Sequence, residues 1–366
     1  MRSLVGALPD VSVAWYYTND RAVHPYESGH LGASVMGGPM IADLIQTWRM
    51  LARKKVQAID KIVDQLIKAD CDCYWIVSHN EGLRIALELI QRQEKPVHIT
   101  VHDDWAGALC ARSTRYRLMA RRANKLSVKT LGAAHSFDVV SKGMQSYYKQ
   151  LTDISAPVCH RYLPAETIAK YKHAEHELAE LSVGHIGSVY SKKQLIAFVR
   201  LFNEYAIGNG KKPVVKMWGC LIAENDLPVG LQSIVKFYPT LPEEQVIPEL
   251  AKCTFAYAQY PFDKHLAVFA KTSLPTKLTS YLQAGRPIFG HGPAVSSLTT
   301  FLNDTGLGAM WDSSDKEQGF VYLERVILVD IAPEKLENAR RQYFGEANIN
   351  LMNQVFLTLP YIDNGL

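Results

Sequence analysis

The sequence predicts an α/β protein built from two doubly wound parallel sheets. Short apolar runs alternate with stretches of helical periodicity, and this alternation stops once and then restarts. A chain of 366 residues also has the length of two ordinary domains. Strands that alternate with helices form parallel sheets covered on both faces, so we expect ligands to bind beyond the carboxyl ends of the strands.

In the first half of the chain, short apolar runs predict strands at residues 11–17, 73–77, 97–101 and 136–141. Between them, apolar residues recur every three or four positions, which predicts helices at residues 41–69, 83–91, 113–126 and 142–150. Residues 18–39 are rich in Gly, Pro and His and are expected to form a loop.

The pattern restarts after a charged stretch that is poor in core residues. Strands are predicted at residues 181–187, 213–219, 235–238, 254–258 and 287–290, with a strongly amphipathic helix at 192–205. The predicted organisation is therefore one domain at residues 1–165, a connector at 166–180, a second domain at 181–332 and a helical segment at 333–366.

Composition sets limits on the function. The chain is 48% hydrophobic and 21% charged, which indicates a soluble globular protein. A net charge of only +4 excludes a strongly basic nucleic-acid binder. The most basic stretch, residues 112–122, is expected to be a solvated helix face, with a weak peripheral contact to anionic lipid as the alternative. Six cysteines without zinc or redox spacing indicate reduced thiols and a cytoplasmic location.

Residues 273–290 are the most informative stretch. They predict a loop of hydroxyls and a lysine, a short helix that starts near Pro275, a glycine stop at Gly285 and a buried strand. Free backbone N–H groups and a cation at a helix start suit a phosphate group. An ordinary capped helix before a strand is the alternative interpretation.

Three further motifs accompany this stretch. A His-Asp pair follows the strand at 97–101, a strand-Ser-x-x-Met-x-x-Tyr element covers residues 137–148, and a glycine turn at 184–188 separates a strand from a long helix. Together with Leu-x-x-Tyr-Leu-x-Ala-Gly-x-Pro at 278–287, they resemble the GT-B glycosyltransferases. The resemblance is strongest to the retaining branch that uses nucleoside-diphosphate sugars.

The resemblance implies two Rossmann-like domains that face each other across a cleft. Residues 1–165 would bind the acceptor, residues 181–332 would bind the nucleotide-sugar donor, and residues 333–366 would cross back to the N-terminal domain. The implied activity is transfer of a hexose-type sugar from a nucleoside diphosphate to a saccharide or other hydroxyl acceptor, in polysaccharide or glycoconjugate biosynthesis. The implied reaction is retaining and needs neither a metal nor a cofactor beyond the nucleotide sugar, which is a co-substrate.

The resemblance also implies site residues. The donor diphosphate would contact residues of the glycine turn and of the loop before the short helix: Gly187, Ser188, Lys193, Thr272, Ser273, Thr276 and Lys277. His102 would contact the donor sugar or the leaving group, and Asp103 or Asp104 would orient that histidine or accept the acceptor's proton. An Asp103-Asp104 metal dyad ranks lower, because the sequence shows no third ligand at a useful spacing. For each histidine and lysine, a structural role is the alternative.

The sequence departs from the family at two carboxylates. Many retaining members carry two glutamates separated by seven residues, and the corresponding positions here are Thr272 and Ser280. The second glutamate normally holds the donor ribose, so this departure keeps two alternatives open. One is a catalytically silent nucleotide-sugar-binding or assembly subunit, and the other is a GT-B nucleotide-sugar epimerase, which the missing carboxylates disfavour.

Overall fold

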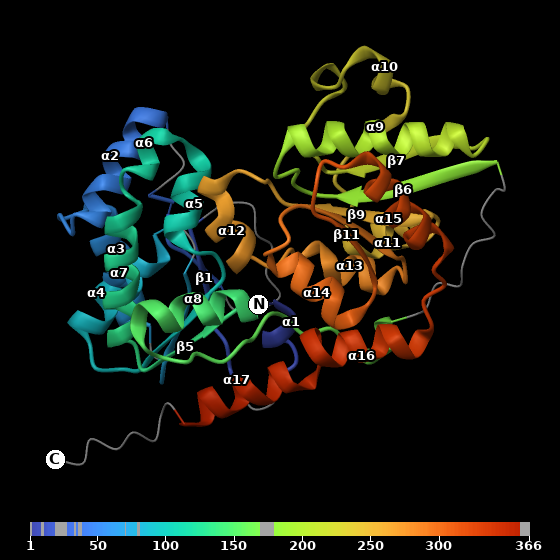
Figure 1. Cartoon of the computed structure of the whole chain (residues 1–366). Coiled ribbons are helices and arrows are strands. Elements are labelled where there is room, and N and C mark those ends of the chain that lie inside the picture. The colour runs from blue at the N-terminus through green and yellow to red at the C-terminus, as the bar shows by residue number, and fades with distance from the viewer. Residues whose placement is uncertain are drawn as a thin grey trace. The chain divides into compact units, whose positions relative to one another are not determined.

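The computed structural model describes residues 2–8, 11–18, 28–32, 34–35, 39–69, 71–78, 81–168 and 179–358 (Figure 1). The chain forms two compact units. The N-terminal unit comprises Met1–Tyr162 together with Glu346–Leu366, and the C-terminal unit comprises Leu163–Gly345. Most of the predicted connector at 166–180 lies outside the described residues.

Among the described residues of the N-terminal unit, a parallel sheet has the strand order β3-β4-β5, and β1 pairs with β2 in a separate parallel ladder. The central strand β4 is buried at all of its positions, as its continuous apolar run predicts. The strands are β1 (Trp15–Tyr17), β2 (Ser28–His30), β3 (Tyr74–Val77), β4 (Val97–Val101) and β5 (Ser136–Val139), and the helices packed with the main sheet include α3 (Gln57–Lys68), α4 (Gly82–Arg92), α7 (Ala120–Ala133) and α8 (Lys142–Thr152).

Two of the predicted helices are each broken in two. The prediction of one continuous helix at 41–69 is wrong. The first helix, α2 (Met40–Leu51), ends at Leu51, and α3 starts only at Gln57. Arg53 adopts a left-handed conformation with φ of 54°, which ends the helical run, and the exposed Lys54 and Lys55 follow it. The helix predicted at 113–126 is likewise divided into α6 (Thr114–Arg117) and α7. On α2, Trp48 is exposed at 43%.

The last helix, α17 (Glu346–Thr358), belongs to the N-terminal unit. It packs against the short α1 (Arg2–Val5), and Met352 and Phe356 share an apolar cluster with Leu4, Leu8 and Cys159. The preceding helix, α16 (Pro333–Phe344), belongs to the C-terminal unit. The predicted segment at 333–366 therefore contains one helix of each unit.

The C-terminal unit is built on a parallel sheet with the strand order β11-β10-β9-β6-β7-β8. The strands are β6 (Glu180–Ile186), β7 (Lys212–Trp218), β8 (Val235–Tyr238), β9 (Phe255–Gln259), β10 (Ile288–His291) and β11 (Gly308–Trp311). All but β11 were predicted from the sequence. Strand order runs outward in both directions from the β6–β9 pair, which is the topological switch point of a doubly wound sheet.

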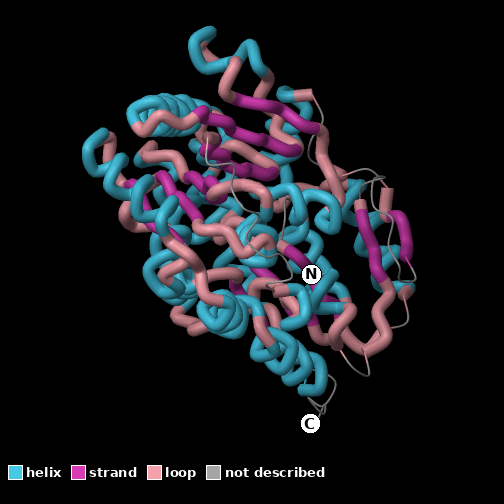
Figure 2. Tube along the Cα trace, turned by 90° about the vertical axis from the view of Figure 1, so that its right-hand side faces the viewer, coloured by secondary structure: helices cyan, strands magenta, loops and turns pink. Residues whose placement is uncertain are grey.

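Helices cover both faces of this sheet (Figures 1 and 2). One face packs against α9 (Lys192–Gly208) and α15 (Lys316–Leu328) through a core that contains Phe198, Phe202 and Phe255. The opposite face packs against α11 (Glu243–Ala251), α13 (Lys277–Gln283), α14 (Ser297–Thr305) and α16. The alternation of strands and helices in the sequence therefore gives the doubly wound arrangement that it predicts.

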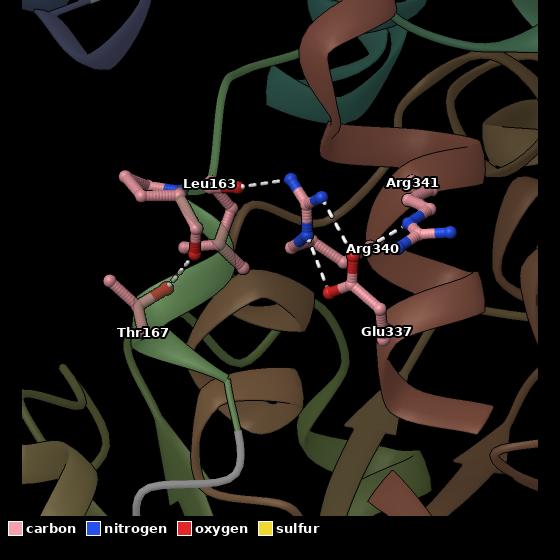
Figure 3. A network of polar contacts seen from close by, with 6 residues as sticks. Leu163, Thr167, Glu337, Arg340 and Arg341 are labelled. Atoms are coloured by element: carbon pink, nitrogen blue, oxygen red, sulfur yellow. Dashed lines mark hydrogen bonds and ion pairs between the residues drawn. The ribbon is translucent and has the colours of Figure 1, made fainter. Parts of the chain in front are cut away.

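A buried ionic network anchors α16 within the C-terminal unit (Figure 3). Arg340 is only 2% exposed and donates to both carboxylate oxygens of Glu337 at 2.8 Å and to the carbonyl of Leu163 at 2.9 Å. Arg341 donates to the same Glu337 carboxylate at 2.7 Å. The Arg340 and Arg341 hydrogen bonds hold the pKa of Glu337 down, at about 2. The network thus ties α16 to the start of this unit's chain.

Candidate donor site

The switch point carries the glycine turn that the sequence predicts. After β6, Gly187 adopts a φ of 69°, a conformation that favours glycine, and its amide donates to the carbonyl of Trp218 at 2.8 Å. No atom lies within 4 Å of the place where a Cβ would stand, so there is open space beside this backbone. Ser188 follows on the surface, and the Ser191 side chain caps α9 by accepting from the amide of Gln194.

Lys277 lies against this turn although it is 90 residues away in sequence. Its side chain is 7% exposed, and Nζ donates to the Ser188 carbonyl at 2.8 Å and to Nε2 of His185 at 3.3 Å. The Nζ atom also lies 5.4 Å from the ring centroid of Tyr190. Among the residues that the structure describes, none of the partners of Lys277 is a carboxylate. The turn and the lysine that the sequence assigned to one site are therefore together.

Burial sets the charge state of these groups. Burial lowers the pKa of Lys277 to about 7, and burial together with the nearby Lys277 lowers the pKa of His185 to about 3. Because His185 Nδ1 lies 2.9 Å from the Tyr257 carbonyl, Nδ1 carries the proton and Nε2 accepts from Lys277. A buried lysine that contacts only neutral groups favours an anionic ligand, since an anion would restore its full charge.

The remaining predicted residues of the 272–277 loop divide into two groups. Thr272 donates its hydroxyl to Val268 inside α12 (Ala267–Thr272), and the Ser273 carbonyl accepts from the hydroxyls of Tyr260 and Ser297. Thr272 and Ser273 are buried, whereas Thr276 is exposed at the start of α13. The contacts of Thr272 are those of a helix residue, and Thr276 is the hydroxyl of this loop that a ligand can reach.

Lys193, the other predicted cation, lies exposed in the first turn of α9. Its neighbour Lys192 is engaged, since Nζ lies 2.7 Å from Oδ1 of Asp226. A diphosphate role for Lys193 stays a prediction.

A carboxylate from another helix lies at one of the two positions where the family glutamates are missing. The Ser280 hydroxyl donates to Oε1 of Glu243 at 3.4 Å, and α11, which begins at Glu243, packs against α13. Sequence reasoning missed Glu243 because the contact joins positions 37 residues apart.

A pocket of about 370 Å³ lies beside the Gly187 turn. It is lined by the aromatic pair Trp218 and Tyr238, whose ring centroids are 5.3 Å apart at an interplanar angle of 19°, and by Lys216, Leu241, Gln245 and Glu249. Because the Trp218 carbonyl accepts from Gly187, the pocket adjoins the turn through the backbone. An aromatic wall with charged and amide side chains suits a planar or saccharide group.

Gln259 is a second residue that sequence reasoning missed. It ends β9 at the switch point, is 1% exposed, and neither atom of its amide has a hydrogen-bond partner among the described residues. A buried amide without partners is costly, so it marks a place where a ligand or water is expected. A glutamine at the end of the apolar run Phe255–Gln259 was the available signal.

In the N-terminal unit, the predicted His102, Asp103 and Asp104 follow β4 directly. Nδ1 of His102 lies 3.7 Å from Oδ2 of Asp103, and both side chains are about one-third exposed, at 34% and 29%. Asp104 differs, because Oδ2 caps α5 (Trp105–Arg112) by accepting from the Gly107 amide at 2.6 Å, and Oδ1 accepts from the buried Tyr148 hydroxyl at 2.9 Å. Burial raises the pKa of Asp104. These contacts favour a helix-capping role for Asp104 and leave His102 and Asp103 accessible for chemistry.

No protein-family model and no curated protein matches the chain, but many solved structures do. Sucrose-phosphate synthase from Thermosynechococcus elongatus is 10% identical, with 98% of this chain and 91% of that one covered and a TM-score of 0.68. WaaG, a glycosyltransferase involved in lipopolysaccharide biosynthesis, is 11% identical, with 100% and 94% covered and a TM-score of 0.59. The chain has the GT-B glycosyltransferase fold.

A third GT-B structure, that of S. aureus TarM, was determined in complex with UDP. It is 10% identical and has a TM-score of 0.54, and the alignment covers 85% of this chain and 61% of that one. These similarities confirm the predicted α/β GT-B architecture. At such low identity they establish the fold alone, so activity and substrates must be argued from the residues of this chain.

Proposed function

We propose that the protein is a glycosyltransferase that moves a hexose-type sugar from a nucleoside diphosphate to a saccharide or other hydroxyl acceptor. The observation that carries this proposal is Lys277, a buried lysine beside the Gly187 turn whose hydrogen-bond partners among the described residues are neutral. This site lies at the switch point of the sheet, where doubly wound folds bind nucleotides. The GT-B neighbours include one determined with UDP, which supports a nucleotide-sugar donor.

The proposed chemistry rests on electrostatics and positioning. As the glycosidic bond of the donor breaks, negative charge grows on the leaving diphosphate. Lys277 and the backbone amide of Ser188 would stabilise that charge in a partly buried site, where such contacts are strongest. Because protein groups supply the positive potential, we expect no requirement for a metal ion or a further cofactor.

The nucleoside would lie on the same side of the C-terminal unit as the diphosphate site at Lys277. We propose that the pocket bounded by Trp218 and Tyr238 receives part of the nucleoside, and that Glu243 accepts from the ribose hydroxyls in place of the missing family glutamate. Ser280 would then orient Glu243 rather than contact the ribose itself. A carboxylate that accepts hydrogen bonds from two hydroxyls is a common way to hold a ribose.

We assign the sugar-side chemistry to the N-terminal unit. In the proposal, His102 contacts the transferred sugar or the leaving group. Asp103 either orients His102 or accepts the proton of the acceptor hydroxyl. Retention follows from the family resemblance alone. The spacing of the cysteines keeps the cytoplasm as the expected location.

A thermal-shift screen against nucleoside diphosphates and their sugars tests the proposed function. A ligand that binds only the folded protein raises its melting temperature, so at least one nucleotide sugar should do so. Incubation with that donor and a panel of saccharide acceptors should then release the nucleoside diphosphate and yield a product heavier by one sugar residue. Donor binding without transfer or hydrolysis would favour the silent-subunit alternative, and no binding at all would contradict both.

Replacing His102 by alanine should lower turnover about tenfold and leave donor affinity nearly unchanged. A contact that strengthens in the transition state acts on kcat rather than on ground-state binding. Steady-state kinetics with calorimetric donor titration separates the two effects. His265→Ala, a change at an exposed histidine of the C-terminal unit, is the matched control. Normal turnover in His102→Ala would make His102 structural.

Replacing Glu243 by glutamine should weaken nucleoside diphosphate binding roughly three- to tenfold, because a charged acceptor of ribose hydroxyls becomes neutral. Its neighbour Glu244 is equally exposed in the first turn of α11, so Glu244→Gln controls for the loss of charge. The comparison should be repeated with the 2′-deoxynucleotide. The difference in affinity between wild type and Glu243→Gln should then be smaller, because one ribose hydroxyl is missing. Equal affinities for all three proteins would remove Glu243 from the site.

A further inference from the structure

Helix α2 exposes a row of large apolar side chains, although it also buries Met50 and Leu51 in the core. Met40, Ile41, Ile45 and Trp48 are exposed at 59%, 68%, 51% and 43%, and their spacing places them along one face of the helix. The inward face combines Met50 and Leu51 with the polar Asp43 and Thr47, which are buried, at 5% and 0%. A helix on a globular protein ordinarily buries its apolar face, so this orientation needs a reason.

Specific contacts hold α2 in this orientation. The buried Asp43 carboxylate accepts from Nη1 of Arg112 at 2.9 Å and from the Tyr116 hydroxyl, which join α2 to the end of α5 and to α6. Burying a carboxylate is costly unless it has partners, and this one accepts hydrogen bonds from one guanidinium and one hydroxyl. Turning α2 over would break these contacts, so the outward apolar face is a built feature of the unit.

Positive charge surrounds this face. Residues 40–55 and 105–133 together contain eleven Lys and Arg and only one acidic residue, for a net charge of +10, whereas the whole chain carries +4. The guanidinium of Arg122 lies 5.9 Å from the ring centroid of Trp48, which brings α7 to the edge of the apolar face. Leu118, between α6 and α7, is 84% exposed and is flanked by the exposed Arg117 and Arg121. Figure 1 shows α2 and α6 side by side, as their shared contact at Asp43 requires.

We propose that this surface, formed by α2, α6 and the start of α7, docks on an anionic lipid bilayer. Isoleucine and tryptophan side chains would enter the interfacial region, while the arginines would contact anionic headgroups with their charged ends. Each basic residue near such a surface adds to the electrostatic attraction by anionic headgroups. Self-association through the same face would bring two strongly positive surfaces together, which electrostatics opposes.

Vesicle sedimentation with the full chain tests the proposal. The wild type should bind vesicles of phosphatidylcholine with about 30% phosphatidylglycerol far better than phosphatidylcholine alone, and binding should fall in about 0.5 M salt. The Ile41→Ser/Ile45→Ser double variant should bind about tenfold more weakly, because two apolar anchors are lost. Val321→Ser/Leu328→Ser is the matched control, since these apolar residues of α15 are also exposed, at 61% and 74%.

A second pair of variants tests the charge. Arg117→Glu/Arg121→Glu should abolish the preference for anionic vesicles, and circular dichroism should show all variants folded because every changed residue is exposed. Three results would overturn the proposal. They are no binding of the wild type to anionic vesicles, vesicle binding by Ile41→Ser/Ile45→Ser that equals that of the wild type, or a wild-type dimer that is absent in this double variant. Binding to single-stranded RNA but not to vesicles would also overturn it.

Discussion

Replacing Lys277 by methionine should weaken nucleoside diphosphate binding by roughly ten- to a hundredfold and leave the fold intact. A charge-assisted contact contributes about 1.5–3 kcal/mol, and methionine keeps most of the length of the side chain. Since Lys277 is buried without a carboxylate partner among the described residues, its removal should not lower the melting temperature. Isothermal titration calorimetry with the nucleotide identified by the thermal-shift screen measures the change.

The pH dependence of binding adds a second readout. Because the pKa of Lys277 in the free protein is lowered to about 7, the lysine loses its proton as pH rises above 7, whereas a bound diphosphate favours the protonated form. Wild-type affinity should therefore decline between pH 7 and 9, and the Lys277→Met variant should show a flatter profile. Lys271→Ala, in the adjacent helix α12, is the control. Identical affinities and pH profiles for Lys277→Met and wild type would remove Lys277 from the site.

Replacing Glu337 by alanine should destabilise the C-terminal unit by about 3 kcal/mol. The change removes the carboxylate to which the buried Arg340, at 2% exposure, donates twice, and breaking a buried ion pair is among the most damaging changes. For a unit of this size the melting temperature should fall by roughly 6–12 °C. Glu334→Ala, at an exposed position of the same helix, should change it little.

The effect of Glu337 should depend on pH in a defined direction. Its folded-state pKa is lowered to about 2, so its contribution is complete above the unfolded value of about 4.3 and is lost as pH falls toward 2. Denaturant unfolding of wild type and Glu337→Ala should therefore converge between pH 4 and pH 2. A constant difference across that range would show that the carboxylate charge does not stabilise the network.

Periodicity predicted most of the fold because the buried strands are continuous apolar runs. The strands β4, β6, β7, β9 and β10 all lie within ranges expected from the sequence or within two residues of them. The strands β2 and β11 were missed. Ser28–His30 falls in the range 18–39 that was expected to be a loop, and the short segment Gly308–Trp311 lacks a distinguishing pattern. The helix predicted at 41–69 failed for a local reason, the left-handed conformation of Arg53, which apolar spacing does not encode.

The site was predictable only in part. The Gly187 turn and Lys277 were recognisable because each follows a local rule, a glycine after a strand and a lysine at a helix start. Glu243 and Gln259 were not, because their significance comes from contacts or from a missing partner that only the folded chain shows. Asp104 had the correct spacing for chemistry, yet its two carboxylate oxygens are engaged by the start of α5 and by Tyr148.

The outward face of α2 shows a different limit. Its apolar periodicity predicts a core helix, and only the contacts of the buried Asp43 with Arg112 and Tyr116 show which side of the helix faces inward. Hydrophobic spacing reports that a helix has an apolar face, but the charges on the neighbouring helices decide which side of the helix is buried. Here the buried side combines the polar Asp43 and Thr47 with the apolar Met50 and Leu51.

A crystal structure of the protein with the nucleotide sugar that stabilises it most is the most direct test of the proposed donor site. We predict that the diphosphate lies within hydrogen-bond distance of Lys277 Nζ and of the Ser188 backbone amide, with the nucleoside toward Glu243 and the Trp218–Tyr238 pocket. A nucleotide sugar bound elsewhere on the chain, with Lys277 still contacting only His185 and Ser188, would contradict the proposed site.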